Sequence, residues 1–207
     1  MKRLPTAGLA VMTAVFIGLI FLANQASAEG NLLLNPSFEE GGHIDSWIND
    51  GDAGVIWVFD WQHQEGKWAF GIGNDLEYSK DGAWGRCLQV VCDSKNPDNL
   101  YKVTPGETFT FKMWIKGEEN YKGKASLKLE FFGYDRRLGF TDDPLASFQS
   151  KIHTGQFVWV QETVSGVVPK DAVSIAISGV SENIPKSMKN SYVWFDDASL
   201  TVSPAQR

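Results

Sequence analysis

Three aromatic side chains spaced two residues apart are the feature of this sequence best suited to binding a ligand. Trp57, Phe59 and Trp61 share one face of an expected strand, because successive side chains of a strand point to opposite faces. A flat indole ring suits the C–H face of a pyranose sugar, and nearby Gln62 can bond to sugar hydroxyls. For Trp57 and Trp61 the sequence favours equally a ligand platform and ordinary packing in a core.

A second set of candidates lies on residues 109–116, whose odd positions are apolar and whose even positions are mainly polar. This alternation predicts a strand with Lys112, Trp114 and Lys116 on its polar face. Tyr134 lies in a stretch without strand alternation. The alternative is plain packing, because most of the eight tryptophans of a sandwich lie in its core. The predicted ligand-binding residues are therefore Trp57, Trp61, Gln62, Lys112, Trp114 and Tyr134.

Motifs for catalysis are absent from the sequence. The three histidines lie far apart, and neither HExxH nor GxSxG occurs. Glycoside hydrolysis needs two carboxylates about 5–10 Å apart across a cleft. Glu130 and Glu162 are candidates, but no strand carries alternate acidic residues on one face. We therefore expect a protein that is not an enzyme, with a glycan-cleaving enzyme as the least favoured alternative.

Strands must position these side chains, and the sequence predicts many of them. Strand-like segments rich in alternating, β-branched or aromatic residues occupy residues 55–61, 109–116, 125–131, 173–178 and 192–202. Turn-forming pairs such as Asp81-Gly82 and Pro105-Gly106 separate them. No stretch shows the apolar repeat of an amphipathic helix. This pattern is typical of an all-β fold, a two-sheet antiparallel β-sandwich.

The first 28 residues have the features of a signal peptide. Lys2 and Arg3 precede the apolar run 9–23, which is shorter than the ~20 residues that span a bilayer. The small residues Ala26, Ser27 and Ala28 then form the pattern of a signal-peptidase cleavage site. We predict cleavage after Ala28, with an uncleaved anchor as the alternative. The exported protein would be secreted, periplasmic or on the cell surface, without stable membrane insertion. It would comprise one domain, residues 29–202, and a C-terminal tail, residues 203–207.

Three segments carry a family resemblance by their order along the chain. Residues 31–41 read NLLLNPSFEEG, residues 103–106 read VTPG before an aromatic strand, and residues 194–200 read WFDDASL. In this order they resemble the β-jelly-roll carbohydrate-binding modules of the family 4, 9 and 22 type, which have a galactose-binding-like sandwich. The resemblance covers essentially all of residues 29–202. It implies non-catalytic binding of a polysaccharide or oligosaccharide, and often a structural calcium ion, but it does not identify the glycan.

Acidic residues of these segments are the expected calcium ligands, since calcium takes six to eight oxygens from carboxylates and carbonyls. Glu39 follows the first expected strand and Asp196 and Asp197 lie in the last, and these strands can be neighbours in a sandwich. By strand alternation Asp196 falls with Ala198 and Leu200, so we expect it to turn inward, where a carboxylate needs a partner or a metal. The alternative is that these acids are solvated or bond to loop amides.

Charge and cysteine content limit the remaining possibilities. The formal charge of −6 argues against nucleic acid as a partner, because proteins that bind it carry a basic face. Cys87 and Cys92 can form a disulfide only if a turn lies between them, so the sequence does not decide whether they are bonded. The main alternative function is an envelope or matrix protein for structure or adhesion. It predicts that Trp57, Trp61 and Trp114 are buried or contact a partner protein.

Overall fold

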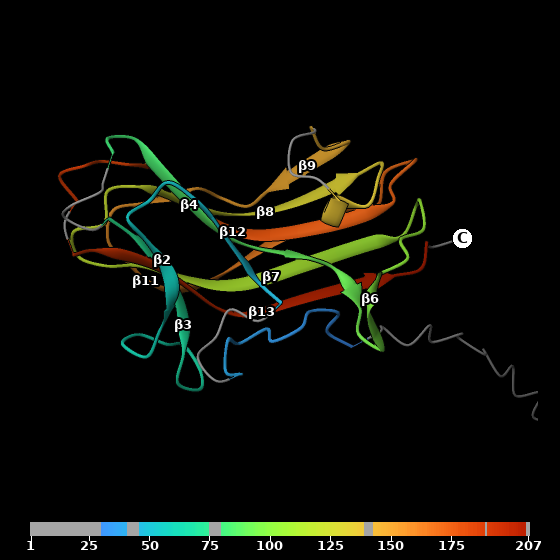
Figure 1. Cartoon of the computed structure of the whole chain (residues 1–207), viewed down its shortest axis with the longest axis horizontal. Helices are drawn as coiled ribbons and strands as arrows, with labels where there is room; N and C mark the ends of the chain where they lie inside the picture. The colour runs from blue at the N-terminus through green and yellow to red at the C-terminus, as the bar shows by residue number, and fades with distance from the viewer. Residues whose placement is uncertain (1–29, 41–45, 75–79, 139–142, 189, 206–207) are drawn as a thin grey trace, which may run out of the picture.

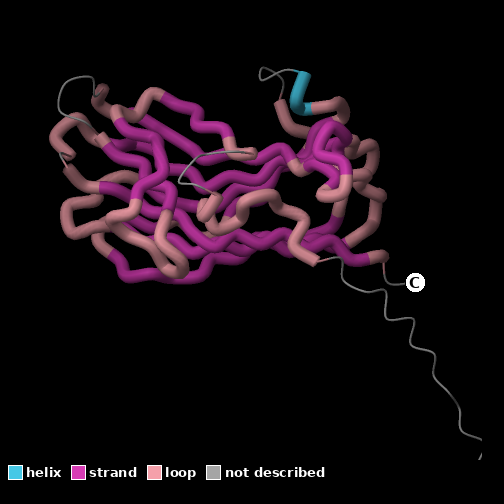
Figure 2. Tube along the Cα trace, turned by 60° about the horizontal axis from the view of Figure 1, so that its bottom comes forward, coloured by secondary structure: helices cyan, strands magenta, loops and turns pink. Residues whose placement is uncertain are grey.

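The computed structural model describes residues 30–40, 46–74, 80–138, 143–188 and 190–205. The predicted signal peptide, residues 1–28, lies outside the described residues. Strands and loops make up nearly all of the described chain, with one short 3-10 helix, η1 (Arg136–Leu138) (Figure 2). Within these ranges, no helix has the length and apolar character needed to cross a membrane.

Two antiparallel sheets pack face to face and confirm the predicted β-sandwich (Figure 1). Sheet A has the order β1 (Ile48–Gly51), β4 (Ala83–Val90), β12 (Ser174–Ile184) and β8 (Lys124–Phe132), and β9 (Ala146–Gln149) and β10 (His153–Thr154) both pair with β8. Sheet B has the order β11 (Phe157–Val167), β7 (Thr108–Gly117), β13 (Tyr192–Ser203), β3 (Ala69–Gly73) and β2 (Val55–Phe59). A separate hairpin joins β5 (Cys92–Asp93) and β6 (Asn96–Leu100).

The core lies between the sheets and follows the predicted alternation. On β7 the buried residues are Phe109, Phe111, Met113 and Ile115, while the polar positions between them stay half-buried. β8 contributes a matching inward row from sheet A, formed by Leu127, Leu129 and Phe131. Burial of each such side chain contributes roughly 1.5–3 kcal/mol, so these two rows account for much of the sandwich's stability.

The N-terminal segment does not form the expected first strand, but it does lie beside the last one. The Leu32 N–H donates to the Leu200 carbonyl over 3.0 Å, and the Ala198 N–H donates to the Pro36 carbonyl over 2.8 Å. The side chain of Asn31 also bridges to the backbone of β13, donating to the Ala198 carbonyl and accepting from the Leu200 N–H. The two acidic segments of the sequence therefore meet at one side of sheet B.

A β-bulge in β13 changes which side chains face the core. Asp196 pairs with Trp114 but Ser199 pairs with Lys112, so three steps on β13 match two on β7. The extra residue, Asp197, has a φ of 46°, a left-handed conformation that aspartate tolerates better than most residues. Asp196 is buried, as predicted, but it lies on the outer face of sheet B and not in the core. Strand alternation alone placed it on the wrong side.

The two cysteines are not joined by a disulfide. Cys87 lies in the interior on β4, and Cys92 is half-buried at the start of β5. Burial raises the pKa of the Cys87 thiol to about 12. Because the thiolate is the reactive form, Cys87 is chemically inert in the folded protein.

Candidate ligand-binding site

Two aromatic rings lie directly on the backbone of β3, on the outer face of sheet B. A Cβ atom at Gly71 would lie 2.8 Å from the indole of Trp194, and one at Gly73 would meet the ring of Tyr192. Glycine at these two positions therefore leaves the space in which the rings lie flat against the sheet. This is the local reason why the motif AFGIG can carry a layer of aromatic side chains.

The chain after β2 adds further rings to this layer. Phe59 and Trp61 stack with ring centroids 4.5 Å apart, and Trp61 packs edge-on against Trp194 at 6.4 Å and Tyr192 at 6.0 Å. Trp194 has no exposed surface, whereas Trp61 is 59% exposed and Trp57, on β2, is 43% exposed. We call this surface the aromatic platform; its members are Trp57, Phe59, Trp61, Tyr192 and Trp194.

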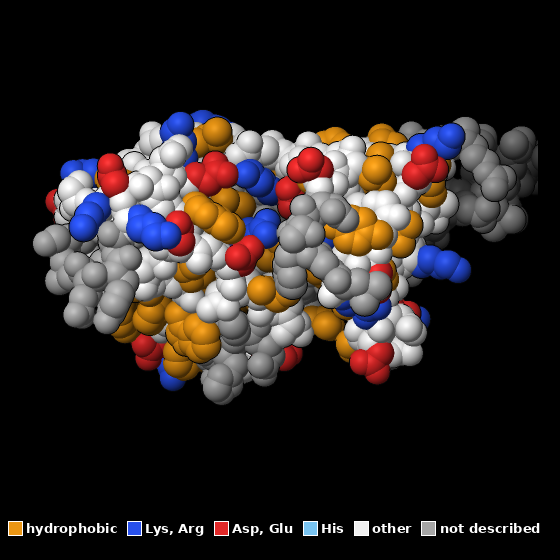
Figure 3. All heavy atoms as spheres, turned by 45° about the horizontal axis from the view of Figure 1, so that its top comes forward, with side chains coloured by type: hydrophobic (Ala, Val, Ile, Leu, Met, Phe, Trp, Pro, Cys, Tyr) orange, Lys and Arg blue, Asp and Glu red, His pale blue; other side chains and the backbone are white. Residues whose placement is uncertain are grey.

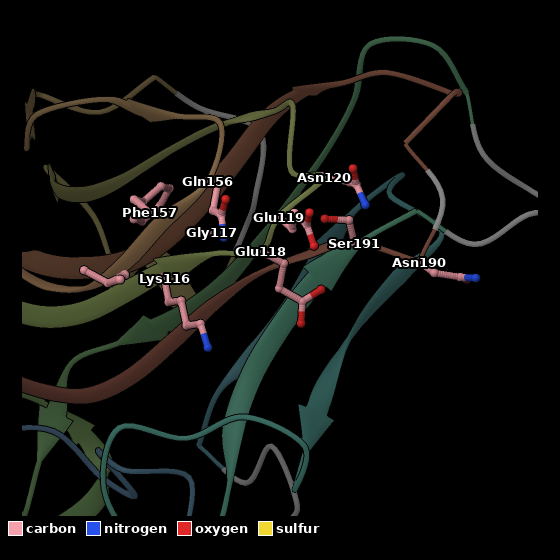
Figure 4. Close-up of a pocket in the computed structure, with 10 residues that line it drawn as sticks. Lys116, Gly117, Glu118, Glu119, Asn120, Gln156, Phe157, Asn190 and Ser191 are labelled. Carbon is pink, nitrogen blue, oxygen red and sulfur yellow. The ribbon is translucent and has the colours of Figure 1, made fainter.

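Polar groups border the aromatic platform where β7 ends. The Lys116 ammonium donates to the side-chain carbonyl of Gln62, which ties the chain after β2 to β7. The Glu118 carboxylate accepts hydrogen bonds from the Trp194 indole N–H, over 2.9 Å, and from the Tyr192 N–H, over 3.0 Å. Figure 4 shows the charged ends of Lys116 and Glu118 on the same side of the sheet. They line a pocket of about 380 Å³ that Glu119, Phe157 and Ser191 also line.

Five of the six predicted ligand-binding residues lie on this outer face of sheet B. Trp114 lies between Gln161 of β11 and Asp196 of β13, and Lys112 lies between Thr163 and Ser199. Trp57, Trp61 and Gln62 complete the set. Tyr134 is separate: its ring packs T-shaped on Phe132, 5.6 Å away, in an apolar cluster outside the main core and on the outer side of sheet A. The fold therefore does not bring Tyr134 to the other five.

The outer face of sheet A carries a charged surface that was not predicted from the sequence. Trp84 on β4 is 37% exposed, and the Arg86 guanidinium lies over its ring. Arg86 pairs with Asp50 at 2.6 Å, and its guanidinium lies 3.9 Å from Glu130. Figure 3 shows such charged groups of both signs beside apolar ones. The signal was the alternation of Trp84 and Arg86 with buried residues in β4, a segment that was not recognised as a strand.

The two glutamates considered for glycan cleavage lie on different sheets. Glu130 faces outward on sheet A, near Arg86. Glu162 on β11 bonds to His153 Nε2 over 2.6 Å, at the side where β11 meets the edge of sheet A. They do not face each other across one surface, so they do not form the carboxylate pair that glycoside hydrolysis requires.

Glu39 holds one half of the loop between β2 and β3, residues 60–68. One oxygen of its carboxylate accepts the N–H groups of Lys67, over 2.7 Å, and Trp68, over 2.6 Å. The loop reaches this carboxylate through Gly66, whose φ is +66° and at which a Cβ would collide with the Glu39 carboxylate. Hydrogen bonds to a charged acceptor contribute more than those between neutral groups, so Glu39 fixes the path of the loop.

Asp196 holds the other half of the same loop. Its Oδ2 accepts the N–H groups of Gln64, over 2.7 Å, and Glu65, over 3.2 Å, and its Oδ1 accepts the N–H of Asp197 over 2.7 Å. Burial raises the pKa of Asp196 to about 6, although the three N–H donors act in the opposite direction. A buried carboxylate with three backbone donors is anchored in one orientation, and the loop that carries Trp61 is anchored with it.

The same two carboxylates are the predicted calcium ligands, together with Asp197. An ionised carboxylate offers about four lone pairs, so Asp196 and Glu39 could each still contribute an oxygen to a cation. No cluster of three or more His, Cys, Asp or Glu side chains suited to a metal occurs in the part of the chain that the structure describes. A calcium ion would therefore take its other ligands from backbone carbonyls, which calcium accepts. Calcium binding here stays a prediction.

Comparison with known proteins identifies the fold and not the family. No family model matches the sequence, and no curated protein matches it. Among solved structures, the CBM22-1 xylan-binding domain from Paenibacillus barcinonensis is 16% identical, with a TM-score of 0.51, and the match covers 82% of this chain and 93% of that chain. A Stig cyclase from Fischerella sp. TAU is also 16% identical, with a TM-score of 0.57 and coverage of 87% and 100%.

A third match extends the range of proteins that share this fold. The enzymatically active domain of tailspike protein 4 from bacteriophage CBA120 is 14% identical, with a TM-score of 0.58. That match covers 83% of this chain, which spans only 21% of the tailspike chain. Binding domains and enzymes thus both occur among the structures with this architecture, and identities this low say nothing about activity. The chain has the β-jelly-roll fold of the carbohydrate-binding modules.

Proposed function

We propose that this protein binds a polysaccharide or oligosaccharide, without cleaving it, on the aromatic platform of sheet B. One observation carries the proposal: two indole rings, Trp57 and Trp61, stay exposed on an outer face after the core of the sandwich is complete. Exposure of rings of this size to water is unfavourable, and covering them with the apolar face of a sugar lowers the free energy. The fold shared with xylan-binding domains supports the same conclusion.

The packing of the aromatic platform orders its rings in the absence of a ligand. Trp61 packs against Phe59, Tyr192 and Trp194, so its ring keeps few alternative orientations. A side chain that is already ordered loses little entropy when a ligand binds. Gln62 and Lys116 lie beside the ring and offer hydrogen bonds to sugar hydroxyls. We propose that the protein acts after export, as its signal-peptide-like N-terminal residues predict.

The exposed rings also bear on the alternative of a purely structural envelope or matrix protein. In one form that alternative buries Trp57, Trp61 and Trp114 together, but the first two are exposed. In its other form the exposed rings contact a partner protein. A carbohydrate-binding experiment separates that form from our proposal, because a protein interface has no reason to hold sugars.

The first prediction concerns binding to a panel of soluble xylan, β-glucan, galactan and polygalacturonate, measured by affinity electrophoresis and calorimetry. At least one polymer is expected to bind, and Trp57→Ala and Trp61→Ala are each expected to weaken that binding about 10-fold, typical of truncating a central aromatic contact. Trp84→Ala is the matched control, since Trp84 is similarly exposed but lies on sheet A. Loss of binding in Trp84→Ala alone would place the site on sheet A and contradict our assignment.

We also propose a structural calcium ion at Glu39 and Asp196. If it binds, mass action stabilises the folded state by about 2.7 kcal/mol at a calcium concentration 100 times the Kd, which corresponds to a rise in Tm of roughly 5–10 °C for a domain of this size. The second prediction is therefore a higher Tm in calcium than in EGTA, measured by calorimetry, and no such difference in Glu39→Gln. An identical Tm in calcium and EGTA for the unmodified protein would rule the ion out.

A further inference from the structure

Two lysines next to the aromatic platform have no acidic partner among the residues that the structure describes. Lys112 and Lys116 point outward from β7, and none of the ion pairs in the described chain includes either of them. Two cations on the outer face of sheet A differ, because Arg86 pairs with Asp50 and Lys128 pairs with Glu182 at 2.7 Å. Among the described residues, Lys112 and Lys116 of sheet B have no such acidic partner.

These lysines form a row with Trp114 between them, which we call the basic strip: Lys112, Trp114 and Lys116. Alternate residues of a strand lie roughly 6.6 Å apart, so about 13 Å separates the two lysines along β7. Thr163 and Ser199 flank Lys112 and can bond to hydroxyls. The basic strip thus combines an aromatic ring, two cations and hydroxyl groups on one extended face.

The acidic groups near the basic strip bond to other partners and form no ion pair with its lysines. Asp196 lies beside Trp114, but its carboxylate accepts three backbone N–H groups beneath the loop. The oxygens of Glu118, two residues beyond Lys116, accept the Trp194 indole N–H and the Tyr192 N–H. Glu118 and Glu119 line the pocket at this end of β7. An anionic ligand would therefore extend from Lys116 along the strip towards Lys112, and not towards Glu118 and Glu119.

We infer that the ligand of this face is an acidic polysaccharide, whose uronic acid carboxylates pair with Lys112 and Lys116 while a sugar ring lies on Trp114 or Trp61. The inference rests on the proposed function and narrows it to one substrate class. A neutral glycan would leave both ammonium groups without a negatively charged partner, whereas a polyuronate supplies one for each. Because the whole chain carries a net charge of −6, attraction of a polyanion has to come from a local group of cations such as this one.

The experiment compares two forms of one polymer that differ in charge. Polygalacturonate and alginate serve as acidic probes, and methyl-esterified polygalacturonate is the uncharged match to the first. We expect the unmodified protein to bind the acidic form at least 10-fold more tightly, and the difference to shrink in 0.5 M NaCl because salt screens exposed charges. The double variant Lys112→Gln/Lys116→Gln should lose the preference for the acidic form while keeping its Tm.

The control removes the same charge elsewhere. Lys151 and Lys170 are exposed residues outside the strands of both sheets, and Lys151→Gln/Lys170→Gln should bind as the unmodified protein does. If both double variants lost the preference for the acidic polymer to the same extent, the attraction would depend on overall charge and not on the basic strip, and the inference would be overturned. The inference would also be overturned if the acidic and esterified polymers bound equally well and the double variant Lys112→Gln/Lys116→Gln bound them as the unmodified protein does. The proposed carbohydrate binding would then remain. Failure to bind any polymer of either panel would overturn the proposed function itself, and the inference with it.

Discussion

Replacing Trp194 by alanine is expected to abolish carbohydrate binding and to lower the free energy of unfolding by about 3–5 kcal/mol, as for other buried aromatic residues. Trp194 has no surface with which to touch a ligand. Phe59, Trp61 and Tyr192 all pack against its ring, however, so its removal leaves a cavity under the exposed ring of Trp61. Urea unfolding measures the loss of stability, and titration with the bound polymer measures the loss of affinity.

Two variants separate the supporting role of Trp194 from a general loss of folding. Trp194→Phe keeps an aromatic ring beneath the platform and should retain most of the affinity. Glu118→Gln keeps a carbonyl oxygen that can accept the indole N–H but loses the acceptor of the Tyr192 N–H, so it should cost about 1–3 kcal/mol, less than Trp194→Ala. If Trp194→Ala folds and binds the polymer with unchanged affinity, the exposed rings need no support from below and our description of the platform is wrong.

A second large effect is expected when Asp196 is replaced by alanine. The free energy of unfolding should fall by about 2–4 kcal/mol, and the ligand should bind less tightly. The change removes the acceptor of three backbone N–H bonds, and bonds to a charged group contribute about 1.5–3 kcal/mol each. Relief of the carboxylate's burial offsets part of that loss. Because Gln64 and Glu65 then lose their anchor, the loop that carries Trp61 should become more sensitive to protease, which limited proteolysis measures directly.

Asp197→Asn provides the matched control for this experiment. It removes a carboxylate from the neighbouring position, and asparagine tolerates the left-handed backbone found there. We expect a change of less than 1 kcal/mol and no change in the protease sensitivity of the loop. The prediction for Asp196 would be wrong if both variants had the same small effect, since the N–H bonds would then contribute nothing beyond the bulk charge.

Part of the fold could be predicted because three of its strands carry an alternating sequence. The sequence predicted β7, β8 and β13 within two residues of their observed ends, whereas it predicted β12 only as far as residue 178 and did not predict β11. β3 was not predicted, because both of its faces are covered, one by the core and one by aromatic rings, and its sequence therefore shows no alternation. β9 and β10 are too short to show any period.

The candidate site was predictable where it depended on spacing within one strand and not where it depended on contacts between strands. The outward positions of Trp57 and Trp114 followed from alternation, whereas the strand predicted for residues 55–61 ends at Phe59 and Trp61 lies in the loop after it. The packing of Trp194 against Gly71 did not, because only the pairing of β13 with β3 brings these two residues together. Tyr134 was misplaced relative to the others for the same reason: a residue in a loop carries no period that assigns it to a sheet.

The bulge in β13 also divides that strand into two parts that can change separately during evolution. Residues 192–196 display rings and a carboxylate toward the loop between β2 and β3, while residues 198–203 pack beside the N-terminal segment. An insertion or deletion in a regular strand would invert every side chain beyond it. Here Asp197 already lies outside the regular pairing, so a one-residue change at this point would be absorbed locally. Descendants of this chain could therefore acquire new ligand specificity on one half of β13 without disturbing the hydrophobic packing of the other.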